Sequence, residues 1–156
     1  IEKFKSFIPL ELVKTTKKLK TNDIIFAGSG ETVEDIGKSV TFVSDSDAYV
    51  GGDSIVFSPT IQCNSVFLSY QLNDDLRRKQ LRKLGQGSSV MHVYTSGIEQ
   101  LKVALPSVLE QNNIAETLRS YANAITAKKE KLSQTQSLKK SLMQDLLTGK
   151  VRVQVN

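Results

Sequence analysis

A stretch of 42 residues between Pro106 and Gly149 contains neither glycine nor proline, the two residues that most often interrupt a helix. Ser107 and Glu110 at its start match a capping box, in which the serine oxygen and the glutamate carboxylate satisfy free helix N–H groups reciprocally. Gly149 stands where a glycine commonly closes a helix. The sequence therefore predicts one helix from about residue 108 to 148, roughly 60 Å long.

Such a helix is too long to pack along its whole length against a domain of about 100 residues, and a helix this polar is marginal in water by itself. We therefore expect it to pair with a partner helix. Its apolar residues follow two heptad tracks that form a seam at both ends, and Lys128, Thr135 and Lys139 make the middle polar, which weakens pairing but favours one register. The expected helix-pairing residues are Ile114, Leu118, Tyr121, Ile125, Leu132, Leu142 and Leu146.

The residues before Pro106 show short apolar runs separated by glycine-containing or polar turns, a pattern typical of short strands. One longer pattern with helical spacing stands among them. We expect strands at 23–27, 39–43, 49–50, 55–57 and 102–105, and a helix from about 66 to 81.

The sequence therefore predicts the α+β class with three parts. Residues 1–106 form a mixed, turn-rich α/β domain, residues 107–149 form one long C-terminal coiled-coil helix, and residues 150–156 form a tail. We expect a cytoplasmic protein, because no apolar run approaches the length of about 20 residues that a membrane span needs and no signal peptide opens the chain.

The net charge of +5 conceals a strong segregation of charge along the chain. Residues 1–20 hold six lysines and two glutamates, whereas residues 21–76 hold one basic and nine acidic residues. Residues 77–83 then carry five positive charges. Segregated charge produces a strong local field, and a phosphate backbone is a natural partner for the basic blocks. A solvated helix face is the simpler interpretation of either block alone.

Catalytic and metal-binding motifs are poorly represented. A single cysteine, Cys63, and a single histidine, His92, argue against a disulfide framework, a multi-cysteine zinc site and a histidine-dependent triad. The ending Gly37-Lys38-Ser39 is that of a phosphate-binding loop, but Thr32 occupies the position of the required first glycine. We therefore expect neither catalytic nor metal-ligating residues.

The order of several motifs resembles the target-recognition domain of type I restriction-modification specificity (S) subunits. The resemblance begins with the segment Leu19–Gly30, the pair Gly37-Lys38 and the segment Ala48–Asp53. The family's domain is longer before its helix, so we expect this chain to lack the N-terminal part of that domain. The later motifs are Gly85–Ser89, Ile98–Leu101, Leu105-Pro106, Glu110-Gln111, Ile114-Ala115 and Leu142–Lys150.

The resemblance implies a function in DNA recognition. An S subunit has two recognition domains, each of which reads half of a split sequence, and two long antiparallel helices that dock the methyltransferase (modification) subunits. This chain would then read one half of a bipartite double-stranded DNA target and meet the restriction subunit through the complex. It would have no cofactor or catalysis of its own, because S-adenosylmethionine and adenine methylation belong to the partner, which flips the base.

Two questions stay open at this stage. Two copies of the chain could form the antiparallel helix pair as a homodimer. The alternative function is a dimeric coiled-coil module that binds proteins and has no DNA specificity.

The expected DNA contacts divide into those that hold phosphates and those that read bases. Basic side chains suit phosphates, and polar side chains on loops suit the edges of bases. The phosphate candidates are Lys14, Lys17, Lys18, Lys20, Arg77, Arg78, Arg82 and Lys83; the base-reading candidates are Ser29, Glu31, Lys38, Ser88, Ser89, His92 and Tyr94.

Overall fold

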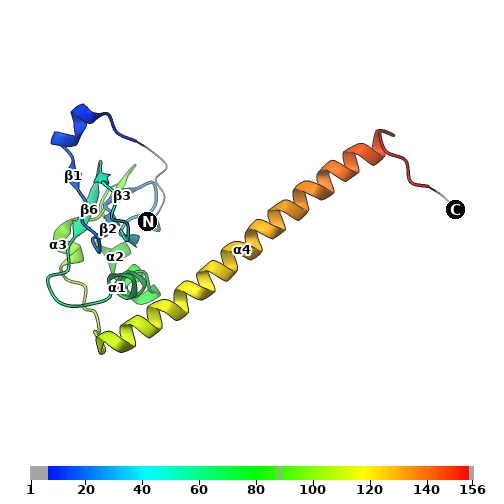
Figure 1. Cartoon of the computed structure of the whole chain (residues 1–156). Helices are drawn as coiled ribbons and strands as arrows, with labels where there is room; N and C mark the ends of the chain where they lie inside the picture. Colours follow the sequence, from blue (N-terminus) through cyan, green and yellow to red (C-terminus); the bar gives the residue numbers. More distant parts are fainter. Residues whose placement is uncertain (1–6, 88, 155–156) are drawn as a thin grey trace. The chain divides into compact units, whose positions relative to one another are not determined.

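The computed structural model describes residues 7–87 and 89–154. The chain forms two compact units that divide between Ala115 and Glu116. Helices and short strands build the first unit, and a long helix continues through the second (Figure 1). This confirms the predicted α+β class with a long C-terminal helix. None of the helices in the described part of the chain is long and apolar enough to cross a membrane.

The first unit is built around a three-stranded antiparallel sheet with the order β4-β2-β6. Strand β2 (Ile24–Ala27) is central, and β4 (Ser39–Thr41) and β6 (Ser54–Phe57) flank it. Ile24 lies opposite Thr41 on one side and Phe57 on the other. These three strands confirm the runs predicted at 23–27, 39–43 and 55–57.

Successive side chains of β2 point to opposite faces of the sheet, and each face packs against a different apolar cluster. Ile24 and Phe26 are fully buried on one face and pack against Leu68 and Leu72. Ile25 packs against a second cluster of Leu19, Phe42 and Ala48. The apolar run of β2 therefore connects two separate apolar clusters.

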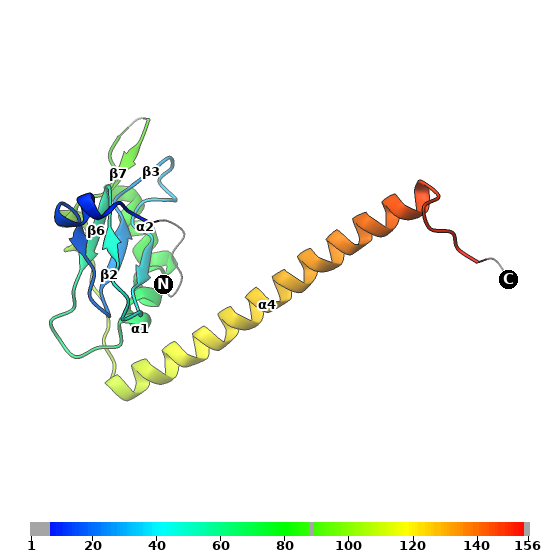
Figure 2. The ribbon, with the colours of Figure 1, turned by 45° about the horizontal axis from the view of Figure 1, so that its top comes forward.

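Two further pairs of very short strands extend the unit. Strand β1 (Lys17–Lys18), which follows the 3₁₀ helix η1 (Leu10–Lys14), pairs with β5 (Tyr49–Val50). The predicted strand at 49–50 is thus present. Strand β3 (Ser29–Gly30) pairs with β7 (Met91–His92), and this pair lies beyond the end of β2 (Figure 2). These pairings join segments far apart in the sequence.

The prediction of one helix over residues 66–81 is wrong, because two helices occupy this region. Helix α1 (Ser65–Leu72) ends at Asn73, and helix α2 (Asp75–Leu84) begins after Asp74. The Asn73 amide accepts from the Ser39 N–H at 2.9 Å and donates to the Ser39 carbonyl at 2.7 Å. Asp74 then caps α2 by accepting the Arg77 N–H at 2.8 Å. A long-range bond to the sheet and a new N-cap therefore divide the helical pattern.

The strand predicted at 102–105 is also absent, and a short helix that the sequence did not predict, α3 (Thr95–Ile98), precedes this segment. Side chains of α1 and α2 donate hydrogen bonds to backbone carbonyls of the segment 102–105. The Gln71 amide donates to the Ala104 carbonyl at 2.9 Å, and the Arg77 guanidinium donates to the Lys102 carbonyl. The segment therefore lies extended against α1 and α2 without joining a sheet.

The predicted long helix is confirmed as α4 (Val108–Leu147), which has 40 residues (Figure 1). The Ser107 hydroxyl accepts the Glu110 N–H at 3.3 Å, as expected for the serine of a capping box. At the other end, Gly149 has a φ of 72°, a left-handed conformation that suits glycine, and donates to the Leu146 carbonyl. Local signals at both ends therefore set the length of this helix.

The first two turns of α4 belong to the first unit and are held there by Gln111. Only 2% of Gln111 is exposed. Its side-chain oxygen accepts the Asn64 N–H at 2.9 Å, and its side-chain nitrogen donates to the Pro106 carbonyl at 2.8 Å. Asn64 also caps α1 and donates to Asn112 at 2.8 Å. A cluster of three side-chain amides thus ties the start of α4 to the start of α1.

Replacing Gln111 by alanine should lower the free energy of unfolding by about 1–3 kcal/mol, because a partly buried N–H and a carbonyl would lose their partners. Gln134→Ala is the matched control, since Gln134 is exposed on the same helix, and should change the free energy by less than about 0.5 kcal/mol. Urea denaturation measures both. Equal effects of the two substitutions would contradict the role of Gln111.

Candidate nucleic-acid interface

Arg78 on α2 is directed into the protein. Only 9% of the residue is exposed. Its guanidinium donates to the Ile36 carbonyl and, at 2.6 Å, to the Glu34 carbonyl, so it holds the loop between β3 and β4. Burial lowers the pKa of the Arg78 guanidinium, and the charge of Arg82 acts in the same direction. The side chain that we expected to bind phosphate is therefore occupied by the protein itself.

Arg77 is occupied in a similar way. Its guanidinium lies 2.6 Å from the Asp74 carboxylate and donates to the Lys102 carbonyl at 3.1 and 3.2 Å. The acid three residues earlier is a visible sequence signal for this pairing, because residues at this spacing are neighbours on a helix. Arg77 and Arg78 therefore have structural roles, and we do not propose them as phosphate contacts.

The rest of the basic block on α2 faces outward. Arg82 is partly exposed, and its guanidinium lies 4.0 Å from the Glu34 carboxylate. Lys83 is exposed, as is Lys79, which the sequence analysis did not include among the DNA contacts. Exposed ion pairs contribute little to stability, so Arg82 can exchange Glu34 for a phosphate at small cost. Arg82 and Lys83 remain the phosphate candidates of α2.

The N-terminal basic block lies on and beside the β1–β5 pair. Lys14 ends η1, Lys17 and Lys18 form β1, and Lys20 follows it, all of them exposed. The Lys18 ammonium lies 2.6 Å from the Asp47 carboxylate, and this hydrogen bond and charge raise the pKa of Lys18. The pair is well exposed, so it leaves Lys18 accessible to another anion.

Lys38 carries a similar exposed ion pair at the end of the loop between β3 and β4. Its ammonium lies 2.7 Å from the Asp35 carboxylate. The hydrogen bond from Lys38, followed by that from Thr32, lowers the pKa of Asp35. Glu31 is exposed in the same loop. Whether Glu31 and Lys38 read bases stays a prediction.

The β3–β7 pair brings three predicted base-reading residues together. Ser29 lies directly opposite His92 in the register of the two strands. The His92 and Tyr94 rings are stacked, with centroids 6.4 Å apart and planes 17° from parallel. Tyr94 is 54% exposed. The arrangement presents a serine and two aromatic side chains with polar atoms at one end of the first unit.

The loop that leads into β7 is closed by backbone bonds. Gln86 and His92 exchange two N–H to carbonyl bonds of 2.7 and 2.9 Å. Gly87 has a φ of 129°, and a Cβ there would lie 2.0 Å from the Val90 carbonyl, so the turn requires glycine. Ser89 is exposed in this loop, whereas the predicted contact Ser88 lies outside the described residues.

A hollow of about 220 Å³, lined by both polar and apolar residues, lies next to these residues. We call it the Gly28 hollow, because Gly28 lies between the two segments that form it. In the sequence, Asp53 follows two glycines and suggested only a turn. The residues that line the hollow include Asp53, Ser54, His92, Tyr94 and Thr95.

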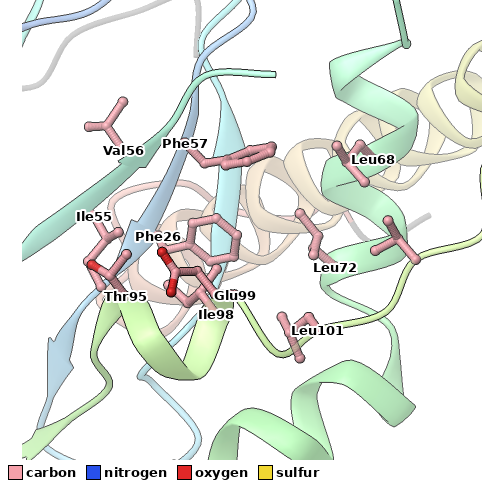
Figure 3. A pocket seen from close by; sticks show the side chains of 11 residues that line it. Phe26, Ile55, Val56, Phe57, Leu68, Leu72, Thr95, Ile98, Glu99 and Leu101 are labelled. Carbon is pink, nitrogen blue, oxygen red and sulfur yellow. The ribbon is translucent and has the colours of Figure 1, made fainter. Parts of the chain in front are cut away.

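A second hollow, of about 260 Å³, is apolar and has a different character (Figure 3). Phe26, Leu68 and Leu72 line it on the side of the core, and Ile98 and Leu101 close it from α3 and the segment that follows. Thr95 and Glu99 are its polar lining residues, so it offers no pair of groups for acid–base or nucleophilic chemistry. Among the described residues, no three His, Cys, Asp or Glu side chains form a group that could hold a metal ion.

Comparison with known proteins identifies the family. The family model described as the type I restriction modification DNA specificity domain matches residues 9–136. The match covers most of the chain and runs from η1 into α4. The chain therefore belongs to the type I restriction-modification DNA specificity domain family, which confirms the resemblance seen in the sequence.

Relatives in two organisms show how much of a longer protein this chain matches. The type I restriction enzyme MjaVIII specificity subunit of Methanocaldococcus jannaschii is 38% identical over 87 residues, which is 56% of this chain and 20% of the relative. The type I restriction enzyme EcoKI specificity subunit of Escherichia coli K12 is 25% identical over 145 residues, which is 93% of this chain and 31% of the relative. The chain thus spans a minor part of these subunits.

Replacing Arg78 by methionine should lower the free energy of unfolding by about 2–4 kcal/mol, because two carbonyls of the β3–β4 loop would lose their donors. The control Arg82→Met removes a partly exposed guanidinium from the same helix and should cost less than about 1 kcal/mol. Chemical denaturation compares the two. An Arg78 variant as stable as the Arg82 variant would show that Arg78 does not hold this loop.

Proposed function

We propose that this chain reads one half of a bipartite double-stranded DNA sequence and docks the methyltransferase subunit of a type I restriction-modification system through α4. The observation that carries the proposal is the family match over residues 9–136, because it includes both the first unit and more than half of α4. The names of the relatives, all specificity subunits of type I restriction enzymes, support the same assignment.

The DNA contacts in this proposal come from the first unit. Outward-facing cations on the β1–β5 pair and on α2 hold phosphates, which fixes the position of the protein on the duplex without reading sequence. The β3–β7 pair and its loop read bases, because their polar side chains are short or rigid and at least partly exposed. The proposed phosphate contacts are Lys14, Lys17, Lys18, Lys20, Arg82 and Lys83; the proposed base contacts include Ser29, Ser89, His92 and Tyr94.

Catalysis belongs to other subunits in this proposal. S-adenosylmethionine binding and adenine methylation take place on the methyltransferase subunit, and DNA cleavage takes place on the restriction subunit, which joins through the complex. The chain supplies the DNA address and works in the cytoplasm, where the DNA of the cell lies.

The seam of α4 supports the pairing of this helix with another helix, which precedes docking of the methyltransferase subunit in the proposal. Leu118, Tyr121, Ile125 and Leu132 are all exposed, and Leu142 and Leu146 continue the seam toward the end of the helix. A row of exposed apolar side chains at heptad spacing is stable when another helix covers it. We propose an antiparallel partner helix, from a second copy of this chain or from another half of the subunit.

The same seam supports a second function, a dimeric coiled-coil module that binds only proteins. The two proposals differ in what the first unit binds. Binding to duplex DNA that weakens with salt is expected only for a specificity subunit.

Lys83→Gln should weaken binding to every DNA sequence by a similar factor and reduce the slope of log affinity against log salt by about one unit, because one phosphate contact is lost. Lys150→Gln, in the tail that follows α4, is the matched control and should leave the slope unchanged. Fluorescence anisotropy at several salt concentrations measures both. An unchanged slope would remove Lys83 from the phosphate contacts.

Leu132→Asp should weaken helix pairing at least about 100-fold, because the new carboxylate would be buried in the seam without a partner. Ser137→Asp adds the same charge outside the two heptad tracks and should leave pairing unchanged. Sedimentation velocity reports the mass of the assembly. Pairing that tolerates Asp at residue 132 would contradict the proposed seam.

A further inference from the structure

We propose that Asp53 reads a cytosine of the DNA target in the major groove, from the Gly28 hollow. This inference rests on the proposed function and adds a residue that determines specificity and the base that it selects. It is carried by the backbone arrangement around Gly28, by the polar lining of the hollow and by the chemistry of a carboxylate close to DNA.

The backbone holds the two sides of the hollow at fixed places. Gly28 follows Ala27, which lies opposite Ser54 in the sheet, and a Cβ at Gly28 would lie 2.0 Å from the Asp53 carbonyl oxygen. On its other side the Gly28 carbonyl accepts the Val93 N–H at 2.8 Å. The turn that carries Asp53 therefore packs closely against Gly28, and the segment that carries His92 and Tyr94 is hydrogen-bonded to it, so only glycine fits there.

Most residues around the hollow are polar and at least partly exposed, and the apolar residues Ile55 and Val93 line it as well. Asp53 is exposed, and no hydrogen bond or ion pair of its carboxylate is found within residues 7–87 and 89–154. The imidazole of His92 and the hydroxyl groups of Ser54, Tyr94 and Thr95 belong to residues that line the same hollow. The His92 and Tyr94 rings are stacked on each other, and both residues line the hollow together with Asp53.

The chemistry of Asp53 restricts what it can bind. A carboxylate accepts hydrogen bonds and cannot donate them, and the phosphate backbone repels it. Within reach of a base edge it therefore pairs with an amino group, which in the major groove is N4 of cytosine or N6 of adenine. Adenine also presents the N7 acceptor beside N6, which repels the second carboxylate oxygen. Cytosine has no such acceptor in the groove, so it is the base that Asp53 selects.

The other polar residues of the hollow suit the guanine that pairs with this cytosine. Guanine presents O6 and N7, which are both acceptors, to the major groove. Hydroxyl and imidazole N–H groups are donors that can meet them. The residues of the hollow thus offer an acceptor for cytosine and donors for guanine, the two bases of a C·G pair.

The test uses the complex of the full chain with its methyltransferase subunit and a library of DNA duplexes with randomised positions, whose bound fraction is sequenced. Wild type should prefer cytosine at one position of the half-site. Asp53→Asn should lower that preference about 10- to 100-fold and shift it toward adenine, because a carboxamide pairs with N6 and N7 together. Preferences at the other positions should stay unchanged.

Two further variants sharpen the result. Asp75→Asn removes the same charge from an exposed acid on α2 and should raise affinity for all sequences alike without changing the preferred bases. Asp53→Glu keeps the carboxylate one methylene further out, so it should retain the preference for cytosine but weaken it. Circular dichroism confirms that each variant is folded, and Asp53→Glu carries the test if Asp53→Asn does not fold.

The outcomes separate this inference from the proposed function. Selective binding by wild type with the same base preferences in the Asp53 variants would overturn the role of Asp53 and leave the proposed function in place. A wild-type complex without any base preference would overturn both.

Discussion

The first unit depends on strand β2, because both neighbouring strands pair with it and each of its faces packs against an apolar cluster. Ile24 and Phe26 anchor one apolar cluster and Ile25 contributes to the other, so a shift of register by one residue would exchange the two faces. The chain then continues through Gly28 into β3, which pairs with β7. The candidate interface is therefore a direct extension of the central strand of the sheet.

The basic side chains of α2 fall into two groups, one directed into the protein and one directed outward. The basic block at 77–83 has the same sign throughout, but its members have different tasks: Arg77 and Arg78 donate to backbone carbonyls, whereas Arg82 and Lys83 face outward. The planar guanidinium offers five donors and suits two carbonyls at once, which an ammonium does in a less fixed geometry. The inward pair holds the loop and the extended segment, and the outward pair is the one that we propose to contact DNA phosphates.

Local signals made the long helix predictable, because Ser107 and Gly149 act within one turn of its ends. The strands of the main sheet were predictable from their apolar runs. Long-range contacts were not: the bonds between Asn73 and Ser39 break a continuous helical pattern, and no local sequence signal pairs β3 with β7. For the candidate site, the sequence indicated basic and polar residues as candidates but not which of them lie close together. Asp53 was missed because its place beside β7 is set by the tertiary structure.

We propose that this chain determines which DNA sequence a methyltransferase modifies. The most direct measurement is to purify the chain together with the methyltransferase subunit, incubate the complex with S-adenosylmethionine and genomic DNA, and map the methylated adenines by sequencing. We expect a stoichiometric complex that methylates one bipartite sequence. A complex that forms but methylates without sequence preference, or a folded chain that forms no complex, would contradict it.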